Sequence, residues 1–208
     1  MIIAIEGPSA AGKTTWCRRF AADRMIPERS KREGALAPDQ VADPDGCARY
    51  WIVNNAQRWS KAQQIATERG WVACDTDPFK LHFSWTQWTL GEGSLEYWTA
   101  AKEFCRDAFG ARQLGIADVV MYADVNEATL RAQKAGDLTR TRSRHDLHIR
   151  LAPALRRWYE AIDRLEPGRV RYQLPPEGID NAILAQGRRV ERTGVVVFDR
   201  LMAELKRG

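Results

Sequence analysis

The chain has 208 residues, and its 32 Lys and Arg against 27 Asp and Glu give a net charge of +5. This length fits one domain over residues 1–208 with a sizeable core, and no apolar run is long enough to span a membrane. The positive balance permits nucleic-acid binding, but phosphate-handling enzymes also concentrate arginine, so the positions of the charges must decide.

The four cysteines lie far apart and form no C-x-x-C pair. They are Cys17, Cys47, Cys74 and Cys105. Neither a zinc site nor a small disulfide scaffold has that spacing. We therefore expect free thiols in a cytoplasmic protein, and no secretory signal, because a phosphate-binding motif already begins at Gly7.

That motif is complete. Residues 7–14, GPSAAGKT, match G-x-x-x-x-G-K-[ST] without a gap. A buried-strand pattern at residues 2–5 precedes it, and a helix-compatible segment at residues 14–25 follows. In such a loop the backbone N–H groups surround an anion, and glycine permits the turns and the close approach. The following helix adds its N-terminal N–H groups and the positive end of its dipole.

The residue types of the loop predict binding of ATP and Mg²⁺. Lys13 can reach the β- and γ-phosphates, and the Thr14 hydroxyl can ligate the metal. The predicted nucleotide contacts are Gly7, Ser9, Ala10, Ala11, Gly12, Lys13, Thr14 and Thr15.

Residues 27–47 are rich in Pro, Gly and charge and show no clear periodicity. We expect a flexible loop, which is either a mobile cover near the substrate or an ordinary surface insertion. A long helix is predicted over residues 48–69, and Gly70 ends it.

Two acidic residues follow the next buried-strand pattern, at residues 71–74. Asp75 and Asp77 stand at the carboxyl end of that strand, where open parallel α/β sheets bind their ligands. A carboxylate there can hold Mg²⁺ or accept the proton of an attacking hydroxyl. We assign Asp75 to this catalytic and metal-binding role and Asp77 to the substrate. Alternatively, Asp77 caps a helix that begins at Pro78.

An aromatic stretch, LHFSWTQW, occupies residues 81–88 of a chain that has eight Trp. Trp85 and Trp88 are three residues apart and can share one helical face. They form either a stacking wall for a flat substrate or a core face packed on the sheet. His82 is a candidate second base and substrate contact, or else a surface or core histidine.

The remaining elements continue an alternating α/β pattern. Residues 95–115 are predicted to be helical, residues 118–123 to form a buried strand and residues 169–174 to form a fifth strand. Two more helix-compatible segments lie around residues 179–189 and 195–206.

Arginines crowd into residues 131–150, which we predict to be a lid. Guanidinium groups that close over a transferring phosphoryl group stabilise its charge and exclude water. The predicted catalytic arginines are Arg131, Arg140, Arg142 and Arg144. The alternative is a solvated basic helix or a patch that contacts RNA.

The order of phosphate loop, acidic strand end, aromatic helix and arginine lid resembles the P-loop nucleoside and nucleoside-monophosphate kinase superfamily. That superfamily also contains phosphotransferases that inactivate antibiotics. The order of features covers most of the chain, but GPSAAGKTT at residues 7–15 is its specific motif. The resemblance implies a three-layer α/β fold with about five parallel strands, and it places Leu174 and Pro175 beside the adenine. It leaves the acceptor open, because CDTDPF at residues 74–79 stands where deoxynucleoside kinases have Asp-Arg-Ser.

These observations predict an ATP- and Mg²⁺-dependent kinase that phosphorylates a hydroxyl of a small molecule, such as a nucleoside, a nucleotide or a nucleoside-like antibiotic. The alternative is a nucleotide-dependent nucleic-acid-binding protein, or an ATPase, that uses residues 131–150. We expect neither a nucleic-acid partner nor a membrane. No pattern specifies the oligomeric state, and a homodimer is allowed.

Overall fold

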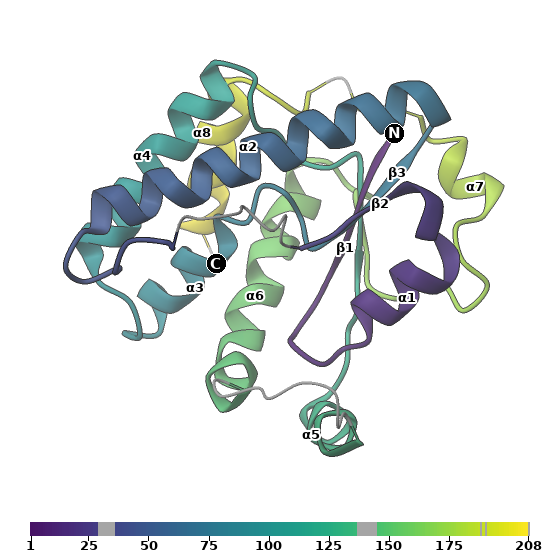
Figure 1. Ribbon diagram of the computed structural model, residues 1–208, viewed down its shortest axis with the longest axis horizontal. Coiled ribbons are helices and arrows are strands. Elements are labelled where there is room, and N and C mark those ends of the chain that lie inside the picture. Colours follow the sequence, from purple (N-terminus) through teal and green to yellow (C-terminus); the bar gives the residue numbers. More distant parts are fainter. Residues whose placement is uncertain (29–35, 137–144, 188, 190, 208) are drawn as a thin grey trace.

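A five-stranded sheet forms the middle of the molecule (Figure 1). The computed structural model describes residues 1–28, 36–136, 145–187, 189 and 191–207. The strands are β1 (Ile2–Glu6), β2 (Met25–Ile26), β3 (Val72–Asp75), β4 (Val119–Tyr122) and β5 (Val170–Arg171). Their order is β2-β3-β1-β4-β5 and every neighbouring pair is parallel, which confirms the predicted α/β class.

Helices cover both faces of the sheet (Figure 1). One face packs against α2 (Pro44–Arg69), α3 (His82–Thr89), α4 (Leu95–Gly110), α6 (His145–Leu165) and α8 (Val195–Leu205). The other face packs against α1 (Lys13–Phe20) and the short α7 (Asn181–Leu184). A single 3₁₀ turn, η1 (Ala22–Arg24), precedes β2, and α5 (Glu127–Gly136) follows β4. The three predicted layers are therefore present.

Strand β1 shows how the sequence builds these layers. Its side chains alternate, so that Ile2 and Ala4 enter the larger core while Ile3 and Ile5 enter the core under α1. All five residues of the strand are buried, and Glu6 at its carboxyl end is the only charged one. The register aligns Ile5 with Asp75, so β1 and β3 end at the same edge of the sheet.

Aromatic rings fill the larger core. Trp158 of α6 contacts Phe79 and Trp85, with ring centroids 5.5 and 5.6 Å apart. Phe109 of α4 packs on Phe79 at 4.7 Å and on Phe198 of α8 at 5.3 Å. Much of the tryptophan excess therefore serves packing between helices.

Helix α2 begins four residues earlier than predicted. The Asp43 carboxylate accepts a hydrogen bond of 2.8 Å from the Gly46 N–H, and Pro44 takes the first helical position. The predicted loop over residues 27–47 is therefore helical from Pro44 onward. Within the described residues, 36–43 precede this helix.

Other boundaries also differ from the prediction. Helix α4 ends at Gly110 instead of residue 115, because Arg112 takes a φ of 57°. The fifth strand is shortened to Val170–Arg171, and only residues 181–184 of the predicted segment 179–189 form a helix. The predicted lid overlaps the end of α5 and the first turns of α6.

The cysteines are buried free thiols, as their spacing predicted. Among the helices that the structure describes, none is both long and apolar enough to cross a membrane.

Candidate active site

The phosphate loop connects β1 to α1 and holds an unusual backbone. Gly7 has a φ of 134°, Ala10 of 74° and Gly12 of 81°. A Cβ at Gly7 would lie 2.8 Å from the Ala123 carbonyl oxygen, so a larger residue would force the loop away from the end of β4. Ala10 is held in the left-handed region without being glycine, and such backbone strain is typical of functional sites.

Lys13 and Thr14 tie this loop to its surroundings. The Lys13 ammonium donates to the carbonyl oxygens of Gly7 and Pro8 at 2.6 and 2.8 Å, so it bridges the mouth of the loop. The Thr14 hydroxyl donates to the Asp75 carboxylate at 2.7 Å. The two predicted magnesium ligands, which are 61 residues apart in sequence, are therefore adjacent.

Asp75 ends β3 and faces the cavity beside the loop. Burial raises the pKa of Asp75, and the Thr14 hydrogen bond and the charge of Lys13 oppose that rise. Among the described residues, no group of three or more His, Cys, Asp and Glu side chains is arranged to hold a metal ion by itself. One carboxylate and one hydroxyl suit Mg²⁺, which usually takes one or two protein oxygens together with substrate phosphates.

A second carboxylate, Glu28, stands two residues beyond β2 and also faces the cavity. Its half-exposed side chain forms an ion pair with Lys80, from the turn between β3 and α3. Burial would raise the pKa of Glu28, but the charge and hydrogen bond of Lys80 outweigh it and hold that pKa at about 2. Glu28 is thus ionised at neutral pH.

Arg58 of α2 crosslinks the ends of β2 and β3. Its guanidinium donates to the carbonyl oxygens of Asp75 and Thr76 at 2.9 and 2.7 Å, and to that of Pro27 at 3.0 Å. The side chain is buried, and these contacts hold the backbone at Asp75 and Thr76 and directly before Glu28. Arg58 therefore sets the spacing of the two carboxylates.

One cavity of about 1360 Å³ connects these groups. The phosphate loop, α1 and residues around Leu174 line one end. Helices α2, α3, α4 and α6 line the rest, through apolar and aromatic residues such as Trp51, Phe83, Tyr97 and Leu155. A cavity of this size has room for two small ligands placed end to end.

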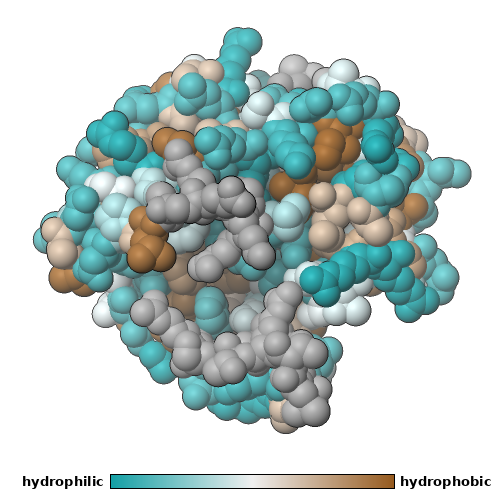
Figure 2. Space-filling model, viewed as in Figure 1, coloured by the Kyte–Doolittle hydropathy of each residue, from teal (hydrophilic) through white to brown (hydrophobic). Residues whose placement is uncertain are grey.

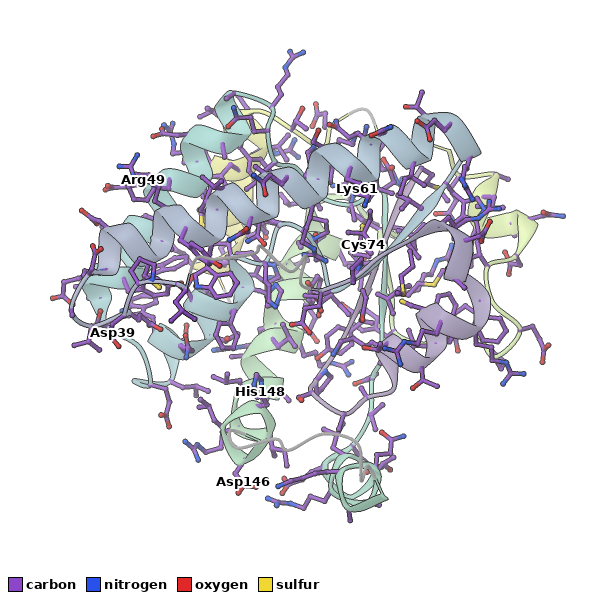
Figure 3. All side chains as sticks on the ribbon, in the orientation of Figure 1. Asp39, Arg49, Lys61, Cys74, Asp146 and His148 are labelled. Carbon is purple, nitrogen blue, oxygen red and sulfur yellow. The ribbon has the colours of Figure 1, made fainter. Side chains whose placement is uncertain are left out.

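The cations that line the cavity gather near the loop. They are Lys13, Arg18, Arg19 and Lys80, and Lys80 is paired with Glu28. Away from the loop, the polar groups in the described wall include the buried Asn55 amide and His148 at the start of α6 (Figure 3). His148 stacks on Phe83 with ring centroids 5.8 Å apart.

Several predicted site residues lie in the cavity wall. All eight predicted nucleotide contacts line it, as do Asp75, His82 and Leu174. The Pro175 carbonyl oxygen instead accepts a 2.7 Å hydrogen bond from the Trp16 indole, and its neighbour Pro176 lines the cavity. His82 is buried, its Nδ1 lies 3.4 Å from the Tyr159 hydroxyl, and burial with the charges of Lys80 and Lys13 lowers its pKa to about 3.

The structure does not bring Asp77 to the cavity wall. The side chain is fully buried beneath it, and its Oδ1 accepts a 3.0 Å hydrogen bond from the Phe79 N–H. This is a local turn at the start of the segment leading to α3, close to the alternative capping interpretation. Burial raises the pKa of Asp77 to about 7, and its Oδ2 has no hydrogen-bond partner in the structure.

Trp85 and Trp88 do not form the predicted stacking wall. Trp85 is buried against Trp158, and Trp88 stacks on Trp98 with centroids 5.7 Å apart, outside the cavity wall. Helix α3 turns these rings toward α6 and α4, where Trp85 is buried and Trp88 stays 39% exposed. The aromatic residue of α3 that lines the cavity is Phe83.

Arg131 lies on the exposed side of α5. It pairs with Glu127 at 2.8 Å and with Asp146 at 3.2 Å, and Figure 3 shows Asp146 at the start of α6, next to α5. It therefore links the two ends of the predicted lid. Arg140, Arg142 and Arg144 lie outside the residues that the structure describes.

Four residues of the site were not predicted from the sequence: Glu6, Glu28, Asn55 and Arg58. Glu6 carried a signal, since a carboxylate ends an otherwise apolar strand directly before the loop. Asn55 and Arg58 share a helical face with Trp51, at spacings of four and three residues. No sequence signal pointed to Glu28, because β2 has only two residues and shows no strand pattern.

No protein-family model matches the sequence, and comparison with curated proteins gives no match. Solved structures do resemble it. Deoxyadenosine kinase from M. mycoides with the products dCMP and dCDP has a TM-score of 0.58 at 14% identity over the whole of both chains. The same kinase with bound dCTP has a TM-score of 0.58 at 14% sequence identity, over the whole of both chains. With bound dATP, the same kinase has a TM-score of 0.56 at 16% sequence identity, over 99% of this chain and the whole of the kinase chain. The chain therefore shares the fold of these structures, a parallel sheet flanked by helices as predicted.

Proposed function

We propose that the protein is a kinase that moves the γ-phosphate of ATP to a hydroxyl of a neutral, ring-bearing small molecule, with nucleosides as the first candidates. The observation that carries this proposal is the cavity itself. A complete phosphate loop and Asp75 line one end, and an aromatic wall without Lys or Arg among its described residues lines the other. An ATPase does not need that second compartment.

The phosphate end fits ATP with Mg²⁺. The loop N–H groups and Lys13 would hold the phosphates, and Lys13 would exchange the Gly7 and Pro8 carbonyl oxygens for phosphate oxygens. Thr14 and Asp75 are hard oxygen donors in contact with each other, which suits a magnesium site. When bound, Mg²⁺ neutralises charge on the β- and γ-phosphates.

Glu28 and Asp75 have different roles in this proposal. Asp75 accepts a hydrogen bond from Thr14 at the proposed metal position, whereas Glu28 lines the cavity and forms an ion pair with Lys80. We assign Asp75 to the metal and Glu28 to the acceptor, where it accepts the hydrogen bond and then the proton of the attacking hydroxyl. Activation of the hydroxyl by Asp75 is the alternative.

The wall beyond the loop favours a nucleoside over a nucleotide acceptor. A phosphate group on the acceptor requires a cation, and Lys80 is already paired with Glu28. Trp51, Phe83 and Tyr97 offer aromatic surface to a flat ring, and the Asn55 amide offers both a donor and an acceptor. The similar structures contain deoxynucleotides, which agrees with a site for a base and a sugar.

The lid arginines complete the proposal. Arg131, Arg140, Arg142 and Arg144 would stabilise charge on the transferring group and exclude water, the competing acceptor. Arg131 pairs with Asp146 across the two ends of this segment.

The location of the protein in the cytoplasm and the formation of a homodimer remain predictions. On the face drawn in Figure 2, hydrophobic residues form separate patches on a mainly hydrophilic surface.

The test is transfer from γ-labelled ATP with Mg²⁺ to a panel of nucleosides, nucleoside monophosphates and hydroxyl-bearing antibiotics, separated by chromatography. We expect label on one or more nucleosides and none on the monophosphates. Label on monophosphates alone would contradict the acceptor class. Release of free phosphate alone, at a rate independent of every acceptor, would favour the ATPase.

A further inference from the structure

Glu6 occupies the floor of the cavity, where β1 ends and the phosphate loop begins. Its side chain is 2% exposed, and it stands one residue before Gly7 and, across the sheet, beside the end of β3. A carboxylate in such a position is costly unless hydrogen bonds satisfy it. Burial raises the pKa of Glu6, and Lys13 and the N–H groups of Asp77 and Gly7 oppose that rise.

The two carboxylate oxygens of Glu6 bind two different turns. One accepts from the Gly7 N–H at 3.1 Å, at the entrance of the phosphate loop. The other accepts from the Asp77 N–H at 2.8 Å, in the turn that follows Asp75. Gly7 and Thr76 both have positive φ, at 134° and 71°, so these N–H groups are aimed by unusual backbone on either side of one carboxylate.

These bonds lie one peptide away from the groups that would bind phosphate and metal. The Gly7 peptide is held at its N–H by Glu6, and the carbonyl of the same residue accepts from Lys13. On the other side, the Thr76 N–H donates to the Ile5 carbonyl at 3.1 Å, so the two peptides that follow Asp75 are fixed, the first by this backbone bond and the second by Glu6.

The side-chain neighbours of Glu6 include the Tyr159 hydroxyl, which hydrogen-bonds to its carboxylate, and Lys13, whose charge lowers its pKa. The nearest ring nitrogen, Nε2 of His82, lies 3.8 Å away, and His82 is neutral near pH 7 because its pKa is about 3. Lys80 is paired with Glu28. The Glu6 carboxylate therefore binds the backbone N–H groups of Gly7 and Asp77 and forms no close ion pair with His82 or Lys80.

From this geometry we infer that Glu6 is a positioning residue that holds the phosphate loop and the Asp75 turn at the spacing needed to bind ATP together with Mg²⁺. It acts through Gly7 and Asp77 and does not touch the reacting atoms. The inference rests on the proposed function for its link to turnover, but its effect on nucleotide binding is independent of any acceptor.

The test uses Glu6→Gln, which keeps one acceptor oxygen, and Glu6→Asp, which keeps the charge but is too short to reach both turns. ATP affinity is measured by calorimetry with and without Mg²⁺. In the wild type we expect Mg²⁺ to tighten binding. In both variants we expect this gain to shrink about tenfold, while metal-free binding changes less than threefold, because Thr14 and Asp75 are no longer held together.

In the transfer assay we expect the variants to lose about 10- to 100-fold in kcat, with the KM for the acceptor little changed. The matched control is Asp118→Asn, which removes a buried carboxylate from the opposite end of the sheet. It should lower the melting temperature and leave the magnesium gain and kcat at their wild-type values.

Either Glu6 variant, provided that it folds, decides the inference. A variant with the wild-type magnesium gain, even with a lowered melting temperature, would show that Glu6 is structural only. A wild type that binds ATP with Mg²⁺ and phosphorylates nothing in the panel would overturn the proposed function, and the binding measurement would still decide the role of Glu6.

Discussion

The two ends of the parallel sheet bury their carboxylates in opposite ways. At the amino end, Asp118 is fully buried and accepts hydrogen bonds from the N–H groups of Ile2 and Arg189 at 2.6 and 2.8 Å. The Arg192 guanidinium adds an ion pair at 2.9 Å. Its charge is thus matched within the chain by a cation and by backbone donors.

At the carboxyl end, the acidic groups are less completely satisfied. Burial raises the pKa values of Glu6, Asp75 and Asp77, and the buried Asp77 Oδ2 has no hydrogen-bond partner among the described residues. Arg58 also lies at this end and donates to carbonyl oxygens, and its Nη1 has no partner in the described part of the chain. The amino end is built for stability, whereas the carboxyl end keeps polar capacity for a ligand, a division expected of open α/β sheets.

The largest effect that this comparison predicts comes from Lys13→Ala. It removes the ammonium that bridges the loop, and we expect a loss on the order of 10³-fold or more in transfer because charge on the phosphates is no longer stabilised. The matched control is Lys61→Ala, an exposed lysine of α2 (Figure 3). Equal activity of the two variants in the label-transfer assay would contradict the role of the loop.

The next effect separates the two acidic residues that face the cavity. Asp75→Asn should lower kcat about 10²-fold or more and weaken the response to Mg²⁺, with ATP binding affected less than turnover. Glu28→Gln should also lower kcat about 10²-fold but keep the response to Mg²⁺, because it acts on the acceptor hydroxyl.

A titration of initial rate against Mg²⁺ concentration distinguishes these two variants, and Glu103→Gln on the exposed side of α4 is the control. Normal turnover of Asp75→Asn would remove Asp75 from the mechanism. If Glu28→Gln were fully active while Asp75→Asn was dead, Asp75 would be the group that activates the hydroxyl.

Asp118→Asn tests the amino end. Breaking this buried ion pair leaves Arg192 without its partner carboxylate, so we expect the free energy of unfolding to fall by about 3 kcal/mol. Chemical denaturation measures that loss, and kcat of the folded enzyme should stay within twofold of the wild type. A large loss of kcat without a loss of stability would mean that the two ends are coupled.

The same contrast explains how far the sequence could predict the molecule. The phosphate loop was predictable in full, because its spacing is local and its backbone demands particular residues. The acidic end of β3 was predictable for the same reason, since Asp75 directly follows an apolar run. The five parallel strands and the three layers followed from the resemblance that these motifs support, whereas the order of the strands was not predicted.

Contacts between distant segments could not be predicted. Glu28 is positioned by the pairing of the two-residue strand β2 with β3. Its ion-pair partner, Lys80, is 52 residues away in the sequence. Trp85 and Trp88 suggested a substrate wall because helical spacing shows that two rings share a face but not what that face meets. The side that meets the cavity was decided by the packing of α3 against α4 and α6.

The smallest predicted effect concerns His82, at the carboxyl end. Burial, with Lys80 and Lys13, lowers its pKa to about 3, while in the unfolded chain the value is near 6.5. Between pH 6.5 and pH 3, His82 therefore binds a proton in the unfolded state but not in the folded state. The free energy of unfolding consequently falls as the pH drops toward 3. His82→Gln removes this proton-binding site.

Between pH 7 and pH 5 we expect the wild type to lose about 2 kcal/mol of unfolding free energy relative to His82→Gln, measured by denaturation at each pH. The difference between the two proteins is the relevant quantity, because the raised pKa values of Glu6 and Asp77 act with the opposite sign in each. A group whose folded pKa is raised stabilises the protein as the pH falls, so the wild-type curve alone mixes both effects. Parallel curves for the two proteins would mean that His82 accepts a proton in the folded state, and the carboxyl end would then be more open to water than its burial indicates.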